Sequence, residues 1–209
     1  MANNGSYFYR IGKQPDTGGA MHNTQAKQQG FTLVEIAIVL VIIGLLLGAV
    51  FKGQELVEQA KIKNTVKKID EVRAAIYVYD DRYDALPGDD NDNNTPTTPN
   101  LANPDDGRIE DPQVWQQLFA AGLISGGGDP LKTPYKTKMA VIYNGGGMKT
   151  NTICVKVPAE VATQIDKRYD DGSPSSGDFR KAGTGANPST NASVATTYGA
   201  SDVWVCTKL

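Results

Sequence analysis

The segment Gly30-Phe31-Thr32-Leu33-Val34-Glu35, followed by an apolar run that ends at Phe51, decides the fold of the N-terminal part of this chain. The 21 residues from Phe31 to Phe51 include only two polar side chains, those of Thr32 and Glu35. A single helix needs about 20 apolar residues to cross a bilayer, so this run predicts a membrane-spanning helix. A carboxylate near the start of such a helix costs free energy, which indicates that Glu35 has a partner or a function.

The residues on the two sides of Gly30 differ in kind. A basic, polar segment with no apolar period precedes Gly30, and the apolar run follows it. An ordinary secretory signal is cut after its apolar core, whereas the small-residue junction here lies before it. Gly30, Phe31, Thr32, Leu33 and Glu35, leading directly into the apolar run, resemble the processing site and first helix of type IV pilins and of the pseudopilins of type II secretion. The alternative is an ordinary signal anchor with an incidental glutamate.

The resemblance implies a processing pathway and a division of the chain into three parts. A membrane-bound prepilin peptidase cleaves such proteins after the glycine, here between Gly30 and Phe31, and methylates the new N-terminus at Phe31. The implied parts are a cleaved leader (residues 1–30), a transmembrane and assembly helix (residues 31–52) and a globular head (residues 53–209) that includes the second half of the helix. The resemblance also implies that the precursor is stored in the inner membrane, where assembly machinery inserts its helix into the core of a helical filament.

Glu35 has an expected role in that assembly. Cleavage exposes a positive amine at Phe31, and Glu35 of a neighbouring subunit can pair with it in a region of low dielectric constant. Such a pair offsets the cost of both charges and sets the axial register of two subunits. The alternative is a glutamate whose side chain only reaches the headgroup region of the membrane.

The helix is predicted to continue beyond the apolar run. Apolar residues recur mainly at steps of three and four as far as Tyr83, which predicts one face of an amphipathic helix. The predicted face consists of Leu56, Ala60, Ile62, Val66, Ile69, Val72, Ile76, Tyr79 and Tyr83. No proline occurs between residues 31 and 86, and Leu86-Pro87-Gly88 ends the pattern. We therefore expect one helix from about residue 31 to residue 84, whose outer half is covered by a head.

The remaining sequence predicts a small head with both helices and strands. Asp111-Pro112 and Gly122 are start and stop signals for a short helix with Val114, Trp115, Leu118 and Phe119 on its apolar face. Strands are predicted at residues 139–143, 152–157 and 203–206, with a Gly-rich hairpin loop at 144–147 and a short helix at 158–167. The predicted fold class is α+β and pilin-like: a long N-terminal helix packed on a small antiparallel sheet.

The two cysteines, Cys154 and Cys206, both lie in predicted strands outside the membrane. An exported protein with two cysteines is expected to pair them, and two buried free thiols are the alternative. In pilins a C-terminal disulfide closes a surface loop against the sheet, and the resemblance gives this pair that role. A catalytic thiol is not expected, because the only histidine, His22, belongs to the leader.

Two acid-rich loops are candidate calcium sites. Asp89, Asp90 and Asp92 lie in the first loop, and Asp170 and Asp171 lie in the second. Hard cations prefer several oxygen ligands close together, although the first loop lacks the spacing of an EF-hand. The alternative is a pair of solvated turns, and no other cofactor is expected.

Charge and motif content narrow the function further. The formal net charge is −2 and the basic residues of the leader are removed by processing, so the chain lacks the basic surface of a nucleic-acid-binding protein. Residues 31–209 contain no histidine, no Cys/His zinc spacing and no phosphate-binding Gly-Lys motif. The expected function is that of a structural subunit of a homo-oligomeric surface filament, used in adhesion, motility or DNA uptake, and not that of an enzyme. The alternatives are a pseudopilin in a periplasmic pseudopilus and a minor pilin whose head is a binding module.

Overall fold

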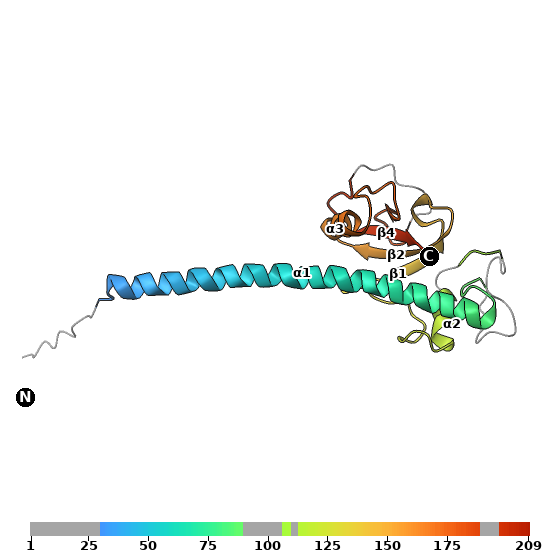
Figure 1. Ribbon diagram of the computed structural model, residues 1–209, viewed down its shortest axis with the longest axis horizontal. Coiled ribbons are helices and arrows are strands. Elements are labelled where there is room, and N and C mark those ends of the chain that lie inside the picture. Colours follow the sequence, from blue (N-terminus) through green and yellow to red (C-terminus); the bar gives the residue numbers. More distant parts are fainter. Residues whose placement is uncertain (1–29, 90–105, 110–112, 189–196) are drawn as a thin grey trace, which may run out of the picture. The chain divides into compact units, whose positions relative to one another are not determined.

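The computed structural model describes residues 30–89, 106–109, 113–188 and 197–209 (Figure 1). Its elements are α1 (Leu33–Tyr83), α2 (Gln113–Ala120), β1 (Met139–Tyr143), the 3-10 helix η1 (Gly145–Gly147), β2 (Asn151–Val157), α3 (Ala159–Tyr169), β3 (Phe179–Lys181) and β4 (Val203–Lys208). The contacts divide the chain into two units, Met1–Leu47 and Gly48–Leu209. The predicted α+β class, with a long N-terminal helix and a small antiparallel sheet, is confirmed, whereas the expected leader, assembly and head boundaries stay predictions.

The long helix α1 is continuous over 51 residues. It ends where Asp84 takes a left-handed backbone conformation, with φ of 54°, and donates its N–H to the carbonyl of Asp80 at 2.8 Å. The change of hand at Asp84 stops the helical hydrogen-bond pattern before Pro87, which could not have continued it. The end predicted from the Leu86-Pro87-Gly88 signal is therefore correct to within a few residues.

The buried face of α1 lies entirely in its C-terminal half. It consists of Ile62, Thr65, Ile69, Val72, Ala75, Ile76 and Tyr79. The predicted apolar face was wrong at its N-terminal end, because Leu56 is 61 % exposed and Ala60 is exposed. An apolar periodicity records which residues avoid water, but it does not record whether the head or another molecule covers them.

Four antiparallel strands form the sheet, in the order β1-β2-β4-β3. Within the second unit, Figure 1 shows β1, β2 and β4 along one side of the C-terminal half of α1. Side chains alternate between the two faces of a strand, so Ile153, Val155 and Val205 face the main core with α1 and α3. The three predicted strands are confirmed, while β3 was missed because its three residues are too few for an alternating pattern.

The opposite face of the sheet holds the disulfide bond. Cys154 and Cys206 lie directly opposite each other on β2 and β4, and both are fully buried beside Trp204. The predicted pairing of the two cysteines is confirmed. Gly145 packs so closely over this bridge that a β-carbon there would lie 2.9 Å from each sulfur atom.

The short helix α2 contributes Trp115 and Leu118 to the main core, and both side chains are fully buried. The prediction for Phe119 was wrong, because its side chain is 44 % exposed. Gly122 ends the helix with a positive φ of 71°, as the stop signal predicted, and the N–H of Leu123 reaches back to the carbonyl of Leu118 at 3.0 Å.

Removing the disulfide tests how much the bond adds to the stability of the head. The bridge joins residues 52 positions apart, and restricting a loop of that length in the unfolded chain is worth about 4 kcal/mol. We expect the double variant Cys154→Ala, Cys206→Ala to lose about that much free energy of unfolding in urea titrations of the detergent-solubilised full chain, followed by tryptophan fluorescence. A loss below about 1 kcal/mol would show that the packing of the sheet stabilises the head without help from the disulfide.

Candidate processing and assembly site

The first turn of α1 is closed by reciprocal hydrogen bonds between Thr32 and Glu35. The N–H of Glu35 donates to Thr32 Oγ1 at 3.2 Å, while the N–H and the hydroxyl of Thr32 both donate to Glu35 Oε2 at 2.9 Å. This arrangement is a capping box, which satisfies backbone amides that have no partner at the start of a helix. It fixes Leu33 as the first helical residue and orients the carboxylate of Glu35 toward the N-terminal side.

The role in assembly that we expected for Glu35 did not include its part in the capping box, nor the hydrogen bonds that Thr32 contributes to it. A Thr followed three residues later by Glu is the sequence signal of a capping box, so both were readable from the chain. Both hydrogen bonds from Thr32 end on Oε2, and Oε1 of Glu35 accepts no hydrogen bond from the described residues. The exposed carboxylate therefore caps its own helix and keeps an oxygen atom for a second donor.

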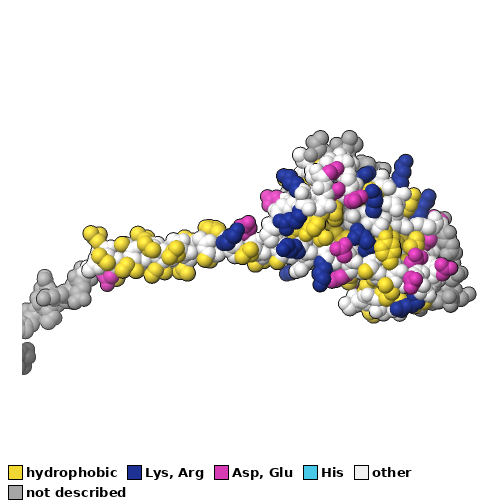
Figure 2. All heavy atoms as spheres, in the orientation of Figure 1, with side chains coloured by type: hydrophobic (Ala, Val, Ile, Leu, Met, Phe, Trp, Pro, Cys, Tyr) yellow, Lys and Arg dark blue, Asp and Glu magenta, His cyan; other side chains and the backbone are white. Residues whose placement is uncertain are grey.

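The segment that follows the capping box is an exposed apolar surface. All residues from Phe31 to Phe51 are exposed, among them Phe31 at 83 % and Leu33 at 90 %. Figure 2 shows hydrophobic side chains over the first part of α1. The most apolar stretch of α1 has a mean hydropathy of 3.0, and it is long and apolar enough to cross a membrane. An exposed apolar patch of this size is not stable in water on a monomer, so lipid or protein has to cover it.

Residues 25–51 match the family model of the prokaryotic N-terminal methylation motif. The chain carries the signature of type IV pilins and pseudopilins. The matched range contains Gly30, Phe31, Thr32 and Glu35, together with the exposed apolar part of α1. Comparisons with curated proteins and with solved structures gave no match. The resemblance inferred from these residues is confirmed, and cleavage after Gly30 with methylation of Phe31 stays a prediction.

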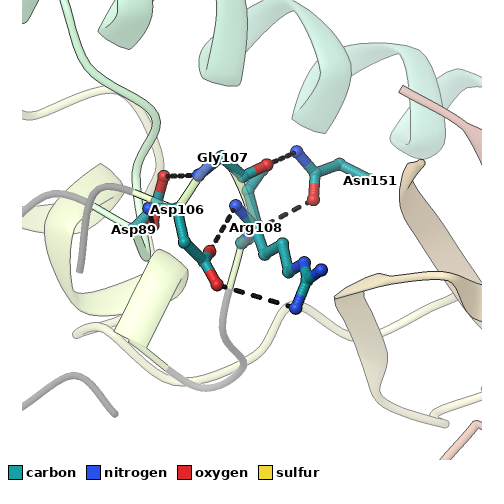
Figure 3. A network of polar contacts seen from close by, with 6 residues as sticks. Asp89, Asp106, Gly107, Arg108 and Asn151 are labelled. Carbon is teal, nitrogen blue, oxygen red and sulfur yellow. Dashed lines mark hydrogen bonds and ion pairs between the residues drawn. The ribbon is translucent and has the colours of Figure 1, made fainter. Parts of the chain in front are cut away.

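The first candidate calcium loop is represented among the described residues by Asp89. Its carboxylate is buried and accepts the N–H of Asp106 at 3.0 Å and the N–H of Gly107 at 2.7 Å (Figure 3). Asp89 therefore links the end of α1 to the segment at residues 106–109. Asp90 and Asp92 lie outside the described residues.

The same polar network continues to the sheet. Asn151, the first residue of β2, donates to the carbonyl of Gly107 at 2.9 Å and accepts the N–H of Ile109 at 3.0 Å (Figure 3). The guanidinium of Arg108 lies 4.7 Å from the ring centre of Tyr143 at the end of β1. Buried polar side chains require hydrogen-bond partners. Asp89 and Asn151 can be buried because backbone groups of residues 106–109 provide these partners.

At the second candidate loop, the carboxylates of Asp170 and Asp171 are joined by a third that the sequence did not indicate. One oxygen atom each from Asp166, Asp170 and Asp171 lie within 4.8 Å of one another. Asp166 lies within helix α3, ahead of the loop, and no loop composition signals its presence at this site. Oxygen donors of this kind suit a hard cation such as calcium, although protein donors already engage all three carboxylates. Calcium binding at either loop stays a prediction.

The donors to these carboxylates fix the loop that follows α3. Asp166 accepts the hydroxyl of Tyr198 at 2.6 Å and the N–H of Gly172 at 3.0 Å, and Asp170 accepts the N–H of Phe179 at 2.7 Å. Burial raises the pKa of Asp166, and the hydrogen bond from Tyr198 opposes that shift. The hydroxyl of Ser176 lowers the pKa of Asp171.

Removing the threonine hydroxyl tests the capping box. Thr32→Val keeps the shape of the side chain but leaves the N–H of Glu35 without its acceptor, which costs about 1 kcal/mol of local helix stability. We expect amide hydrogen exchange in the first turn of α1, measured in detergent micelles, to accelerate roughly five-fold, because about 1 kcal/mol corresponds to that factor. Thr32→Ser retains a hydroxyl and should exchange like the wild type. Equal rates in all three proteins would contradict the cap.

Removing the Tyr198 hydroxyl tests the buried carboxylate with a pH dependence. Because the folded pKa of Asp166 is raised, its contribution to stability is largest below about pH 4 and is lost as pH rises through the folded pKa. Tyr198→Phe removes a bond that opposes this shift, so the pKa should rise further. We expect a loss of about 1–3 kcal/mol at pH 7 and a smaller loss below about pH 4.

The matched control is Tyr169→Phe, at an exposed tyrosine of the helix that carries Asp166, which should change the free energy of unfolding at neither pH. A Tyr198→Phe loss that grows as the pH falls would show that the carboxylate is not the partner that matters.

Proposed function

We propose that this chain is a structural subunit of a type IV pilus-like surface filament, assembled through the N-terminal part of α1. The proposal depends on one observation: 21 consecutive exposed residues, almost all apolar, begin at a capped carboxylate inside a methylation motif. Such a surface can be covered by lipid before assembly and by the same segment of other copies afterwards. A helix that serves only as a membrane anchor requires neither the methylation motif nor the charge of Glu35.

The free oxygen of Glu35 supports the role proposed for this residue in assembly. A prepilin peptidase that cuts between Gly30 and Phe31 creates an amine next to Thr32. Thr32 engages Glu35 Oε2 within one chain, so the amine of a second chain can donate to Oε1 without breaking the capping box. Pairing of the two charges in an apolar environment offsets the cost of burying either one alone.

The remaining parts of the proposal follow from the signature and from the residues outside it. The family with this signature is structural rather than catalytic. Residues 31–209 contain no histidine, and both cysteines form the disulfide, so nucleophilic catalysis lacks its usual groups. We therefore propose no enzymatic activity, storage in the inner membrane, and export as a homo-oligomer by membrane assembly machinery.

A charge-neutral substitution separates the two roles of Glu35. Glu35→Gln keeps a side chain that can complete a capping box, because glutamine serves at this position as glutamate does, but it removes the charge. We expect Glu35→Gln cells to contain processed, membrane-stored subunit and at least about ten-fold less subunit in sheared surface fibres, since losing one partner of a buried charge pair costs several kcal/mol. The readout is immunoblotting of the membrane and sheared fractions.

Thr32→Val is the matched control, because it removes the cap and leaves the charge. It should assemble more than Glu35→Gln does. Normal fibres in Glu35→Gln, or an equal defect in both variants, would contradict the charge-pair proposal. Subunit that stays in the periplasmic and membrane fractions of the wild type under all conditions would favour the pseudopilin alternative.

A further inference from the structure

The head first touches α1 at Glu58 and Gln59, which are half-buried, whereas every residue of α1 before them is exposed. The hydroxyl of Tyr135 donates to Glu58 Oε1 at 2.7 Å. The guanidinium of Arg168, at the C-terminal end of α3, donates to Gln59 Oε1. The loop that carries Tyr135 and the end of α3 therefore both lie beside the first covered turn of α1.

Basic residues gather around this turn. Residues 52–63, 132–138 and 164–168 together hold eight basic residues against three acidic ones, in a chain whose formal net charge is −2. Figure 2 shows Lys and Arg side chains on the head near the point where α1 enters it. We define the basic patch as the four exposed members nearest in sequence to these contacts that have no carboxylate partner among the described residues: Lys63, Lys136, Lys167 and Arg168.

The acidic residues near the basic patch are already engaged. Glu55 and Glu58 each pair with a lysine of α1, at 2.8 Å and 3.4 Å. Asp166 is buried, and Asp170 and Asp171 accept hydrogen bonds from the loop that follows them. The described residues therefore leave the positive charge of the basic patch available to another molecule.

The position of the basic patch is set by its distance from the end of the apolar run. As a helix, 21 residues span about 30 Å, which matches the hydrocarbon core of a bilayer and puts Phe51 at its edge. Headgroups occupy about 5–7 Å beyond that edge. Leu56 and Val57, which are 61 % and 56 % exposed, follow Phe51 by about 8–9 Å along α1. Gln59 follows by about 12 Å, so its contact with Arg168 lies within one Debye length of the headgroups, about 8 Å at physiological salt.

The other end of the head carries the opposite charge. Residues 80–89 hold four carboxylates against one basic residue. An anionic surface attracts the basic patch and repels this acidic end. Both effects favour the same orientation of the head, with the end of α3 toward the membrane.

We infer that the basic patch binds the headgroups of anionic phospholipids and holds the head against the membrane before assembly. The inference rests on the proposed storage of the subunit in the membrane. Phosphate oxygens accept strong hydrogen bonds from lysine and arginine, and Arg168 has further N–H donors besides the one used by Gln59. Each basic residue near such a surface changes the ratio of docked to free heads about five-fold.

An acidic protein surface is the competing partner for the same charges. It leaves the exposed Leu56 and Val57 to be covered separately, because these two residues lie between the apolar run and the basic patch. A lipid surface covers the apolar run, this apolar pair and the basic patch together. The chemistry of one membrane therefore accounts for all three.

Electron paramagnetic resonance of the full chain in lipid nanodiscs tests this inference. A nitroxide is attached at Gln164→Cys, since Gln164 lines one surface hollow with Lys167 and Arg168, and the native cysteines stay in their buried disulfide. Every disc contains the same small fraction of a nickel-chelating lipid, whose metal enhances the relaxation of a nearby nitroxide. We expect the enhancement to be at least about two-fold larger in discs that contain phosphatidylglycerol than in discs of phosphatidylcholine alone, and the difference to disappear at high salt.

Neutral substitutions assign the effect to the basic patch. Lys63→Gln and Lys167→Gln should each lower the enhancement in anionic discs, because each changes the ratio of docked to free heads about five-fold. The matched control is Lys149→Asn, which removes the same charge from an exposed lysine between η1 and β2. Asparagine tolerates the positive φ of 52° at this position, and the control should behave like the wild type.

The possible results separate the basic patch from the proposed function. Equal enhancement in both kinds of disc would overturn lipid binding and leave the basic patch for an acidic protein surface. A lipid-charge effect that neither Lys63→Gln nor Lys167→Gln reduces would overturn the assignment to these residues. A wild-type chain that does not enter the discs would overturn membrane storage in the proposed function, and the lipid contact with it.

Discussion

The exposed apolar half of α1 is the constraint on which the rest of this protein depends. A surface of this length has no stable place in water, and the structure offers no element of its own to cover it among the described residues. It therefore has to be covered by lipid or by protein. The single carboxylate in that segment, Glu35, is tolerated because Thr32 holds it at the helix start and because one oxygen remains for a partner.

The head has the complementary task of stabilising the other half of the same helix. Burial of α1 begins at Ile62 and is completed by the main face of the sheet and by α2 and α3. The disulfide lies on the opposite face, where the apolar cluster is small, and it joins the two central strands. The stretch of α1 between Phe51 and Ile62 belongs neither to the apolar segment nor to the core, which leaves Leu56 and Val57 exposed.

Sequence reasoning succeeded where one physical pattern determines the outcome. The apolar run and the Gly-Phe-Thr-Leu-Val-Glu segment predicted the helix and the signature. Short runs of apolar and β-branched residues, with a Gly-rich loop between the first two, predicted β1, β2 and most of β4. It failed where tertiary contacts decide. The local apolar pattern does not show that Leu56 and Phe119 stay exposed. The sequence around Asp170 and Asp171 does not show that Asp166 lies beside them, and the three residues of β3 are too few to predict a strand. The spacing of Thr32 and Glu35 is the sequence signal of a capping box, but Glu35 was interpreted only as a charge with a role in assembly.

The central claim is that the apolar half of α1 is an assembly surface created by processing at Gly30. The most direct test is mass spectrometry of the subunit recovered from sheared surface fibres, combined with electron microscopy of the same preparation. The account predicts that the chain is the main component of the fibres and begins at an N-methylated Phe31. Fibres that lack this chain, or a surface-exposed chain that still carries residues 1–30, would contradict it.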